Sequence, residues 1–143
     1  MSDLCVEMNL ITILFVDSHP LIQKAWHFLF GQDARFELVG TCETGERAIE
    51  LTKTLSPDIV IIDTNLKGMS GMEATRKILK DGPDVKVIGL SFDIRHESAM
   101  KLIQNGAKGC LTKISSPEEI FKTIIEVQKG ETYICKEIST LLF

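Results

Sequence analysis

The stretch Pro57-Asp58-Ile59-Val60-Ile61-Ile62-Asp63 decides the fold predicted for this chain. Its four central residues are apolar on both faces, which is typical of a central parallel strand covered by helices on each side. A carboxylate, Asp63, ends the run. In an open parallel sheet, functional groups gather where the strands end and the loops turn toward helices. The stretch therefore predicts both a buried strand and the position of a site.

Three further apolar runs end in polar residues in the same way. The four predicted strands cover 11–16, 59–62, 87–90 and 109–111, and they end at or next to Asp17, Asp63, Ser91 and Lys113. Two carboxylates, a hydroxyl and an ammonium at such strand ends indicate a site for a divalent cation and a phosphoryl group.

Helical patterns alternate with these strands. Apolar residues at helical spacing predict helices that begin near Pro20 and cover about 48–55, 71–80, 98–104 and 116–125, and a more exposed strand is expected at 36–39. Five strand–helix units predict a doubly wound α/β fold with strand order 2-1-3-4-5. Ser116 and Glu119 form a capping-box pattern, in which each side chain is expected to bind the backbone amide of the other. Trp26 and Phe30 are expected in the core.

Composition limits the classes of function. With 143 residues, of which 44% are hydrophobic, the chain suits one globular domain. A net charge of −4 excludes a general nucleic-acid footprint. No apolar run is long enough for a membrane span, and no basic region precedes one as in a signal peptide. Four scattered cysteines are typical of reduced thiols in a cytosol. We expect a cytoplasmic domain at 11–129, an N-terminal tail at 1–10, and a C-terminal tail or the start of a linker at 130–143.

The predicted chemistry centres on Asp63. A carboxylate there can attack phosphorus and form an acyl phosphate, a transfer that needs a divalent cation such as Mg²⁺. Asp17, Asp63 and one backbone carbonyl are candidate ligands, Lys113 can hold a phosphoryl oxygen, and Ser91 can donate to another. Taken singly, Asp17 could equally cap a helix, Ser91 could be a loop hydroxyl and Lys113 a surface charge.

In this order along the chain, the motifs resemble the receiver domain of bacterial two-component response regulators. The resemblance covers about 12–134, and its motifs are 13–20, 57–63, 68–74, 90–91 and 106–113. His19-Pro20 and Gly130-Glu131-Thr132-Tyr133 resemble the NarL/LuxR-type subfamily in particular.

The resemblance implies a flavodoxin-like (CheY-like) fold with a five-stranded parallel sheet. It implies Mg²⁺-dependent phosphorylation of Asp63 by a sensor histidine kinase, with self-catalysed phosphotransfer as the only reaction of the chain. It also implies that the backbone carbonyl of Asn65 binds the metal and that Ser91 and Lys113 sense the phosphoryl group. A homodimer, and a DNA-binding output domain outside this chain, are the implied partners.

Three residues depart from the family pattern. Ser18 stands where a second acid is usual, so it can bind the metal only as a neutral oxygen or through water. Lys67 stands where proline is usual, and near the site its charge would oppose a cation. We therefore predict weak Mg²⁺ binding. Cys110 replaces a frequent aromatic residue and is interpreted as a buried core cysteine.

Two other functions are alternatives to the phosphorylated switch. A degenerate receiver that acts as a phosphorylation-independent interaction module is favoured by Ser18, Lys67 and Cys110. A phosphohydrolase of the aspartyl-phosphate type is disfavoured, because Thr64 and Asn65 follow Asp63 without the second acid that such enzymes need.

Overall fold

The computed structural model describes residues 10–82, 84–92 and 95–139, and in them a six-stranded parallel sheet forms the centre. The strand order is β2-β1-β3-β4-β5-β6, so the flavodoxin-like fold is confirmed but the prediction of five strands is one short. The strands are β1 (Ile11–Val16), β2 (Phe36–Cys42), β3 (Ile59–Asp63), β4 (Lys86–Ser91), β5 (Gly109–Thr112) and β6 (Tyr133–Ile134).

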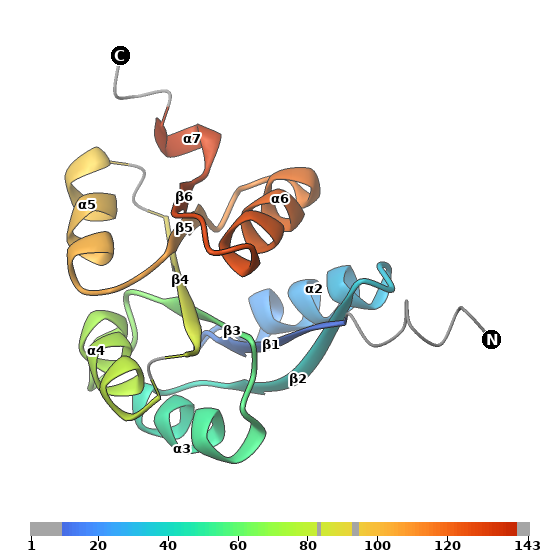
Figure 1. Cartoon of the computed structure of the whole chain (residues 1–143). Helices are drawn as coiled ribbons and strands as arrows, with labels where there is room; N and C mark the ends of the chain where they lie inside the picture. The colour runs from blue at the N-terminus through green and yellow to red at the C-terminus, as the bar shows by residue number, and fades with distance from the viewer. Residues whose placement is uncertain (1–9, 83, 93–94, 140–143) are drawn as a thin grey trace.

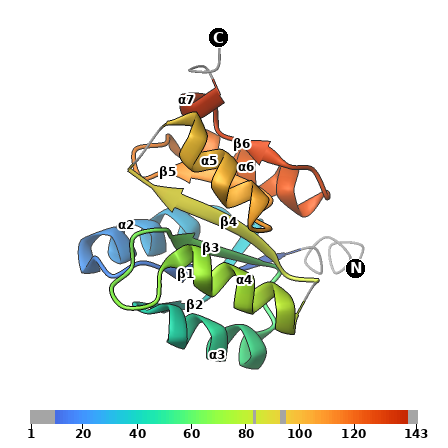
Figure 2. The ribbon, with the colours of Figure 1, turned by 90° about the vertical axis from the view of Figure 1, so that its left-hand side faces the viewer.

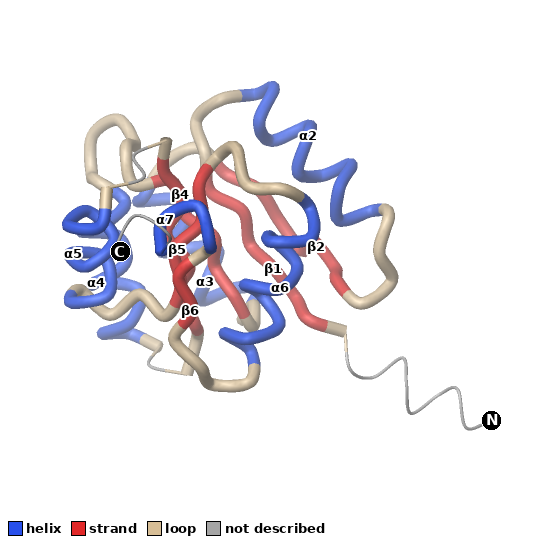
Figure 3. The backbone as a smooth tube through the Cα atoms, turned by 90° about the horizontal axis from the view of Figure 1, so that it is seen from above, coloured by secondary structure: helices blue, strands red, loops and turns tan. Residues whose placement is uncertain are grey.

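Helices cover both faces of this sheet, as a parallel sheet requires. They are α2 (Pro20–Gly31), α3 (Gly45–Leu55), α4 (Gly71–Asp81), α5 (His96–Gln104), α6 (Pro117–Gln128) and α7 (Lys136–Ser139). Figures 1 and 3 show α2 and α6 on one face and α3, α4 and α5 on the other. No helix in the described part of the chain is both long enough and apolar enough to cross a membrane.

Side chains that alternate along the strands supply the core on each face. On one face Phe15 of β1 stacks on Trp26 of α2 with ring centroids 4.7 Å apart, and Phe30 lies next to Trp26. On the other face Leu14 and Val16 join a second buried cluster with residues of α3 and α4. The predicted burial of Trp26 and Phe30 is confirmed, because they are 5% and 2% exposed.

The predicted capping box at α6 is only half formed. Ser116 caps the helix by accepting a hydrogen bond from the backbone N–H of Glu119. The Glu119 carboxylate does not return to Ser116. It accepts instead from the Tyr133 hydroxyl at 2.9 Å and from the backbone N–H of Lys136 at 2.7 Å. A buried carboxylate needs strong donors, and the segment after α6 supplies them.

The segment after α6 was expected to be a tail or linker. Its described residues form strand β6, which extends the sheet, and the short helix α7. Strand β6 pairs with β5, and the side chains of Cys135 and Ile138 are 0% and 2% exposed. Figure 2 shows α7 beside one end of α5. Residues 133–139 therefore contribute to the core of the domain. The expected N-terminal tail lies outside the described residues, except for Leu10.

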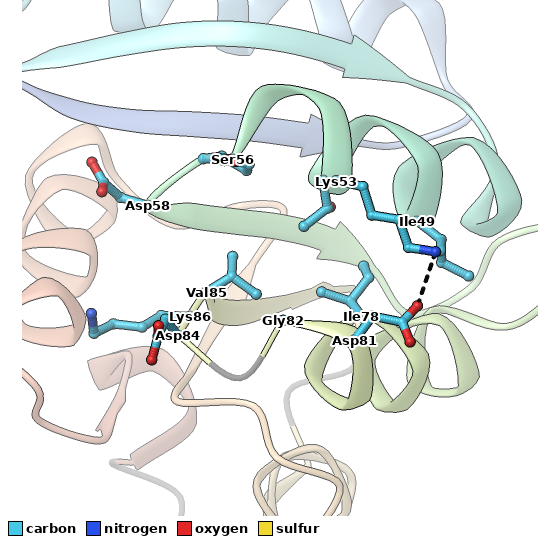
Figure 4. A pocket seen from close by; sticks show the side chains of 12 residues that line it. Ile49, Lys53, Ser56, Asp58, Ile78, Asp81, Gly82, Asp84, Val85 and Lys86 are labelled. Atoms are coloured by element: carbon cyan, nitrogen blue, oxygen red, sulfur yellow. Dashed lines mark ion pairs between the residues drawn. The ribbon is translucent and has the colours of Figure 1, made fainter.

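A pocket of about 540 Å³ opens between α3 and α4, at the sheet end opposite Asp63 (Figure 4). Lys53 and Asp81 form an ion pair of 3.3 Å across it. None of the residues predicted to form the site lines this pocket.

Candidate functional site

Asp17 and Asp63 lie side by side at the carboxyl ends of adjacent strands. Val16 pairs with Ile62 in the parallel register of β1 and β3, so the next residue of each strand is an acid. Both carboxylates are 0% exposed. The backbone N–H of Asn65 donates to Asp63 Oδ1 at 2.9 Å, which fixes one oxygen of the predicted phosphoacceptor.

Lys113 joins the two acids. Its backbone N–H donates to the Ser91 carbonyl at 3.0 Å, which continues the pairing of β4 with β5. Its Nζ lies 2.9 Å from both Asp17 Oδ2 and Asp63 Oδ2, and its side chain is only 2% exposed. Burial by itself lowers the pKa of Lys113, but hydrogen bonds and charge interactions with Asp63 and Asp17 outweigh it and raise the pKa above its usual value. Lys113 is therefore a buried ammonium, not a surface charge, and it leaves the trio with a formal charge of −1.

Phe92 covers the ammonium from the solvent side. Its ring centroid lies 5.0 Å from Lys113 Nζ, within the range of a cation–π contact worth about 0.5–1 kcal/mol at exposed sites. The Phe92 ring is 65% exposed. Sequence reasoning missed this residue, since an aromatic after Ser91 carries no pattern that points to Lys113.

His19 belongs to the same group of polar atoms. Its Nδ1 lies 2.8 Å from Asp17 Oδ1 and 3.3 Å from Lys113 Nζ, and its backbone N–H also donates to Asp17 Oδ1. One ligand atom each from Asp17, His19 and Asp63 lies within 4.8 Å of the others. On sequence grounds His19 is a secondary candidate, because a histidine at a helix start is usually structural.

Gln23 of α2 fixes the loop that carries Asp17 and His19. Its Nε2 donates to the Asp17 carbonyl at 2.6 Å and to the Cys42 carbonyl at 3.0 Å. This bridge ties the ends of β1 and β2 to the first turn of the helix. Sequence analysis did not single out Gln23, because a glutamine on a helix gives no signal of its partner.

Asp63 lines a pocket of about 580 Å³ between the strand ends and α5. Besides Asp63, His19 and Lys113, it is lined by Asn65, Ser91, Phe92 and residues of α5, β5 and α7. The structure thus brings Ser91 and Asn65 to the pocket that contains Asp63. Ser18 is half-buried next to Asp17, whereas Lys67 is exposed and does not line this pocket.

The donor set fits a divalent cation. Asp17 Oδ2 is buried and receives no hydrogen bond of good geometry, although Lys113 Nζ is close to it. This oxygen is ion-paired, so a cation would bind it by displacing the ammonium, and a second carboxylate is adjacent. The same ammonium competes with a metal for both acids.

Gly71 allows the loop after Asp63 to close tightly. A Cβ at Gly71 would lie 2.1 Å from the Asp63 carbonyl oxygen and 2.8 Å from the Thr64 Cα. Only glycine leaves room for this approach of α4 to the end of β3. Gly71 therefore allows the start of α4 to lie directly against the backbone of Asp63 and Thr64.

Cys110 is a buried thiol of the pocket wall, which confirms the interpretation from sequence. It is 1% exposed and its Sγ lies 3.7 Å from the Ala99 carbonyl oxygen. Burial raises the pKa of this thiol to about 12, so it is protonated at neutral pH. Cys42, Cys110 and Cys135 are all free and buried.

A comparison with family models decides what this arrangement is. The model described as the response regulator receiver domain matches residues 13–125. This chain belongs to that family. The flavodoxin-like fold that the resemblance implied is confirmed, with a sixth strand added at the β5 edge.

Relatives of this receiver domain are longer response regulators. The response regulator GacA of Pseudomonas aeruginosa is 33% identical over 133 residues, which are 93% of this chain and 62% of the relative. The response regulator UvrY of Escherichia coli is 33% identical over 130 residues, 91% of this chain and 60% of the relative. This chain thus spans less than two thirds of these relatives.

A solved structure shows the same fold. It is a two-component response regulator of the LuxR family from Aurantimonas sp. SI85-9A1, with a TM-score of 0.87 and 27% sequence identity. The match covers 92% of this chain and 94% of that one. The receiver domain described here therefore has the complete layered fold of such a chain.

Proposed function

We propose that this receiver domain accepts a phosphoryl group on Asp63 from a sensor histidine kinase. The observation that carries the proposal is the placement of a buried carboxylate at the end of β3, with Asp17 on one side and the Lys113 ammonium 2.9 Å from its Oδ2. Ser91 and Asn65 line the same pocket.

In the transfer, a carboxylate oxygen of Asp63 forms a bond to phosphorus as the bond from phosphorus to the donor histidine nitrogen breaks. The products are an acyl phosphate and a free imidazole. Lys113 is placed to hold an oxygen of the bound phosphoryl group as a point charge, and the Ser91 hydroxyl is a donor for another. The chain acts on itself and is not otherwise an enzyme.

A divalent cation would be held by Asp17, Asp63 and the backbone carbonyl of Asn65, with Ser18 as a neutral oxygen at most. When bound, it supplies positive charge that offsets the repulsion between the phosphoryl oxygens and the carboxylates. We propose that Mg²⁺ binding is weak, for two reasons. Ser18 supplies no charge, and a cation must displace Lys113 from at least one acid.

The switch would act beyond this chain. We propose that phosphorylation shifts the domain toward a second conformation, that the protein forms a homodimer in the cytoplasm, and that an output domain outside this chain binds DNA. The relatives named as response regulators are longer than this chain, which covers 62% and 60% of them, and that extra length leaves room for an output domain.

The test is the intact mass of the domain after incubation with acetyl phosphate, with and without Mg²⁺. We expect a phosphoryl adduct that depends on Mg²⁺ and is lost in Asp63→Asn. A domain that stays unmodified with both acetyl phosphate and its kinase would instead be a phosphorylation-independent interaction module. The supporting observation for that alternative is the ion pairing of Lys113 with both acids.

A further inference from the structure

The loop after β1 places the His19 imidazole against the Asp17 carboxylate. His19 precedes Pro20, and a residue before proline is restricted to extended backbone, as its φ of −95° and ψ of 113° show. The His19 backbone N–H donates to Asp17 Oδ1 at 2.9 Å. The backbone and the side chain of His19 therefore both face the Asp17 carboxylate. The Gln23 side chain holds the backbone carbonyl of Asp17 in place.

The two polar contacts of His19 Nδ1 cannot both be hydrogen bonds at the same time. Nδ1 lies 2.8 Å from Asp17 Oδ1 and 3.3 Å from Lys113 Nζ, but it carries either one proton or one lone pair. A protonated Nδ1 can donate to Asp17 but offers nothing to the ammonium. An unprotonated Nδ1 can accept from Lys113 but then points its lone pair at a carboxylate oxygen.

A shared cation uses both atoms as acceptors. Two ligand atoms with bonds of about 2.1 Å to one ion, at a right angle to each other, lie about 3.0 Å apart. The distance of 2.8 Å between Nδ1 and Asp17 Oδ1 is close to that value. The buried Asp17 Oδ2 lies 2.9 Å from the Lys113 ammonium, and it is a second ligand atom on the same carboxylate that a cation would take over from the ammonium.

The chemistry of this donor set bears on which cation binds. Mg²⁺ is a hard ion that prefers six oxygen ligands, whereas imidazole nitrogen suits first-row transition metals. Ser18 supplies no anionic oxygen, and the trio of Asp17, Asp63 and Lys113 has a formal charge of only −1. In such a site, a neutral nitrogen ligand raises the affinity for a transition metal more than the affinity for Mg²⁺.

We propose that His19 Nδ1 is a metal ligand and that it makes this site selective for a divalent first-row transition metal over Mg²⁺. The inference deepens the proposed metal-dependent function, but it concerns binding alone. The His19 side chain is 56% exposed, so a metal can reach it from solvent.

The experiment compares Co²⁺ and Mg²⁺ affinities of the metal-free domain by calorimetric titration, with the visible absorption of Co²⁺ as a second readout. The variants are His19→Ala and His19→Asp, with His27→Ala as the matched control, since His27 is an exposed histidine of α2 that is not part of the metal-ligand group. Fluorescence of Trp26 checks that each variant is folded.

We expect His19→Ala to weaken Co²⁺ binding by about tenfold or more, because loss of even an outer partner of a metal ligand costs about that much. Mg²⁺ affinity should change by less than about threefold, and His27→Ala should change neither. His19→Asp replaces the imidazole by a further carboxylate next to Asp17. This variant should therefore bind Mg²⁺ in preference to Co²⁺.

Equal losses for the two metals in His19→Ala, or unchanged Co²⁺ affinity and spectrum, would overturn the inference. No phosphoryl donor is present in these titrations. A domain that binds Co²⁺ through His19 but takes no phosphoryl group would therefore contradict the proposed function and leave the inference intact.

Discussion

Replacing Lys113 by methionine tests the electrostatic centre of this domain. The change keeps an unbranched side chain of similar reach but removes the ammonium that lies 2.9 Å from Asp17 and from Asp63. Two buried carboxylates then face each other with no counter-charge, and we expect a large loss of stability.

The magnitude follows from the geometry. At 2.9 Å and an effective dielectric of about 20, each ion pair is worth about 6 kcal/mol before desolvation is subtracted. Desolvation of the buried ammonium offsets much of this. Removal of one partner from a buried pair typically costs about 3–5 kcal/mol, and we expect a decrease of that size in the free energy of unfolding of Lys113→Met at pH 7.

The assay is urea unfolding followed by the fluorescence of Trp26, the only tryptophan of the chain. Added Mg²⁺ should stabilise Lys113→Met more than the wild type, because the cation no longer competes with an ammonium. A cation present at one hundred times its Kd would raise the free energy of unfolding by about 2.7 kcal/mol. Lys108→Met is the matched control, since Lys108 is an exposed lysine just before the same strand.

The reasoning is refuted if Lys113→Met unfolds within about 1 kcal/mol of the wild type while Lys108→Met does the same. It is equally refuted if Mg²⁺ stabilises wild type and Lys113→Met to the same extent, because the ammonium would then not compete with the metal.

Three further predictions concern other parts of the fold. Gly71→Ala should lower stability by more than about 1 kcal/mol and displace the loop after β3, whereas Gly31→Ala, with open space around its Cβ, should be neutral or stabilising in thermal unfolding. Glu119→Ala removes two hydrogen bonds to a buried carboxylate and should cost about 2–4 kcal/mol, with faster hydrogen exchange at 133–139, while the exposed neighbour variant Glu118→Ala should change little. Burial, together with the Glu119 hydrogen bond, raises the pKa of Tyr133 to about 12, so absorbance at 295 nm should report a midpoint near that value for this single tyrosine. The unfolded chain loses this proton first, near pH 10, so stability should fall as pH rises from about 10 to 12, and a midpoint near 10 in the folded protein would contradict the buried contact.

Sequence patterns predicted the parts of this fold that depend on one segment at a time. The run 59–62 is a fully buried strand, and the order of Asp17, Asp63, Ser91 and Lys113 placed them correctly at strand ends, because parallel strands bring such residues to one edge. Strand β6 was missed since two residues are too few for a periodic signal.

Contacts between distant side chains were the harder part. Glu119 matches a capping box in the local sequence. In the folded chain its carboxylate accepts hydrogen bonds from the Tyr133 hydroxyl and the Lys136 amide and not from the Ser116 amide. The position of His19 over Asp17 follows from the extended backbone before Pro20 and from the Gln23 bridge, neither of which is visible as a motif. Phe92 acquires its role only through the fold.

The pocket beside Asp63 has a consequence for how a local event is transmitted. Ile138 of α7 lines the same pocket as Asp63, and Glu119 binds the start of that short helix through the Lys136 amide. A bulky group added at Asp63 would compete for volume with a wall that the C-terminal segment helps to build. The position of α7 and the space beside Asp63 are therefore linked through the shared pocket wall, and a shift of α7 would change the volume available to a group on Asp63.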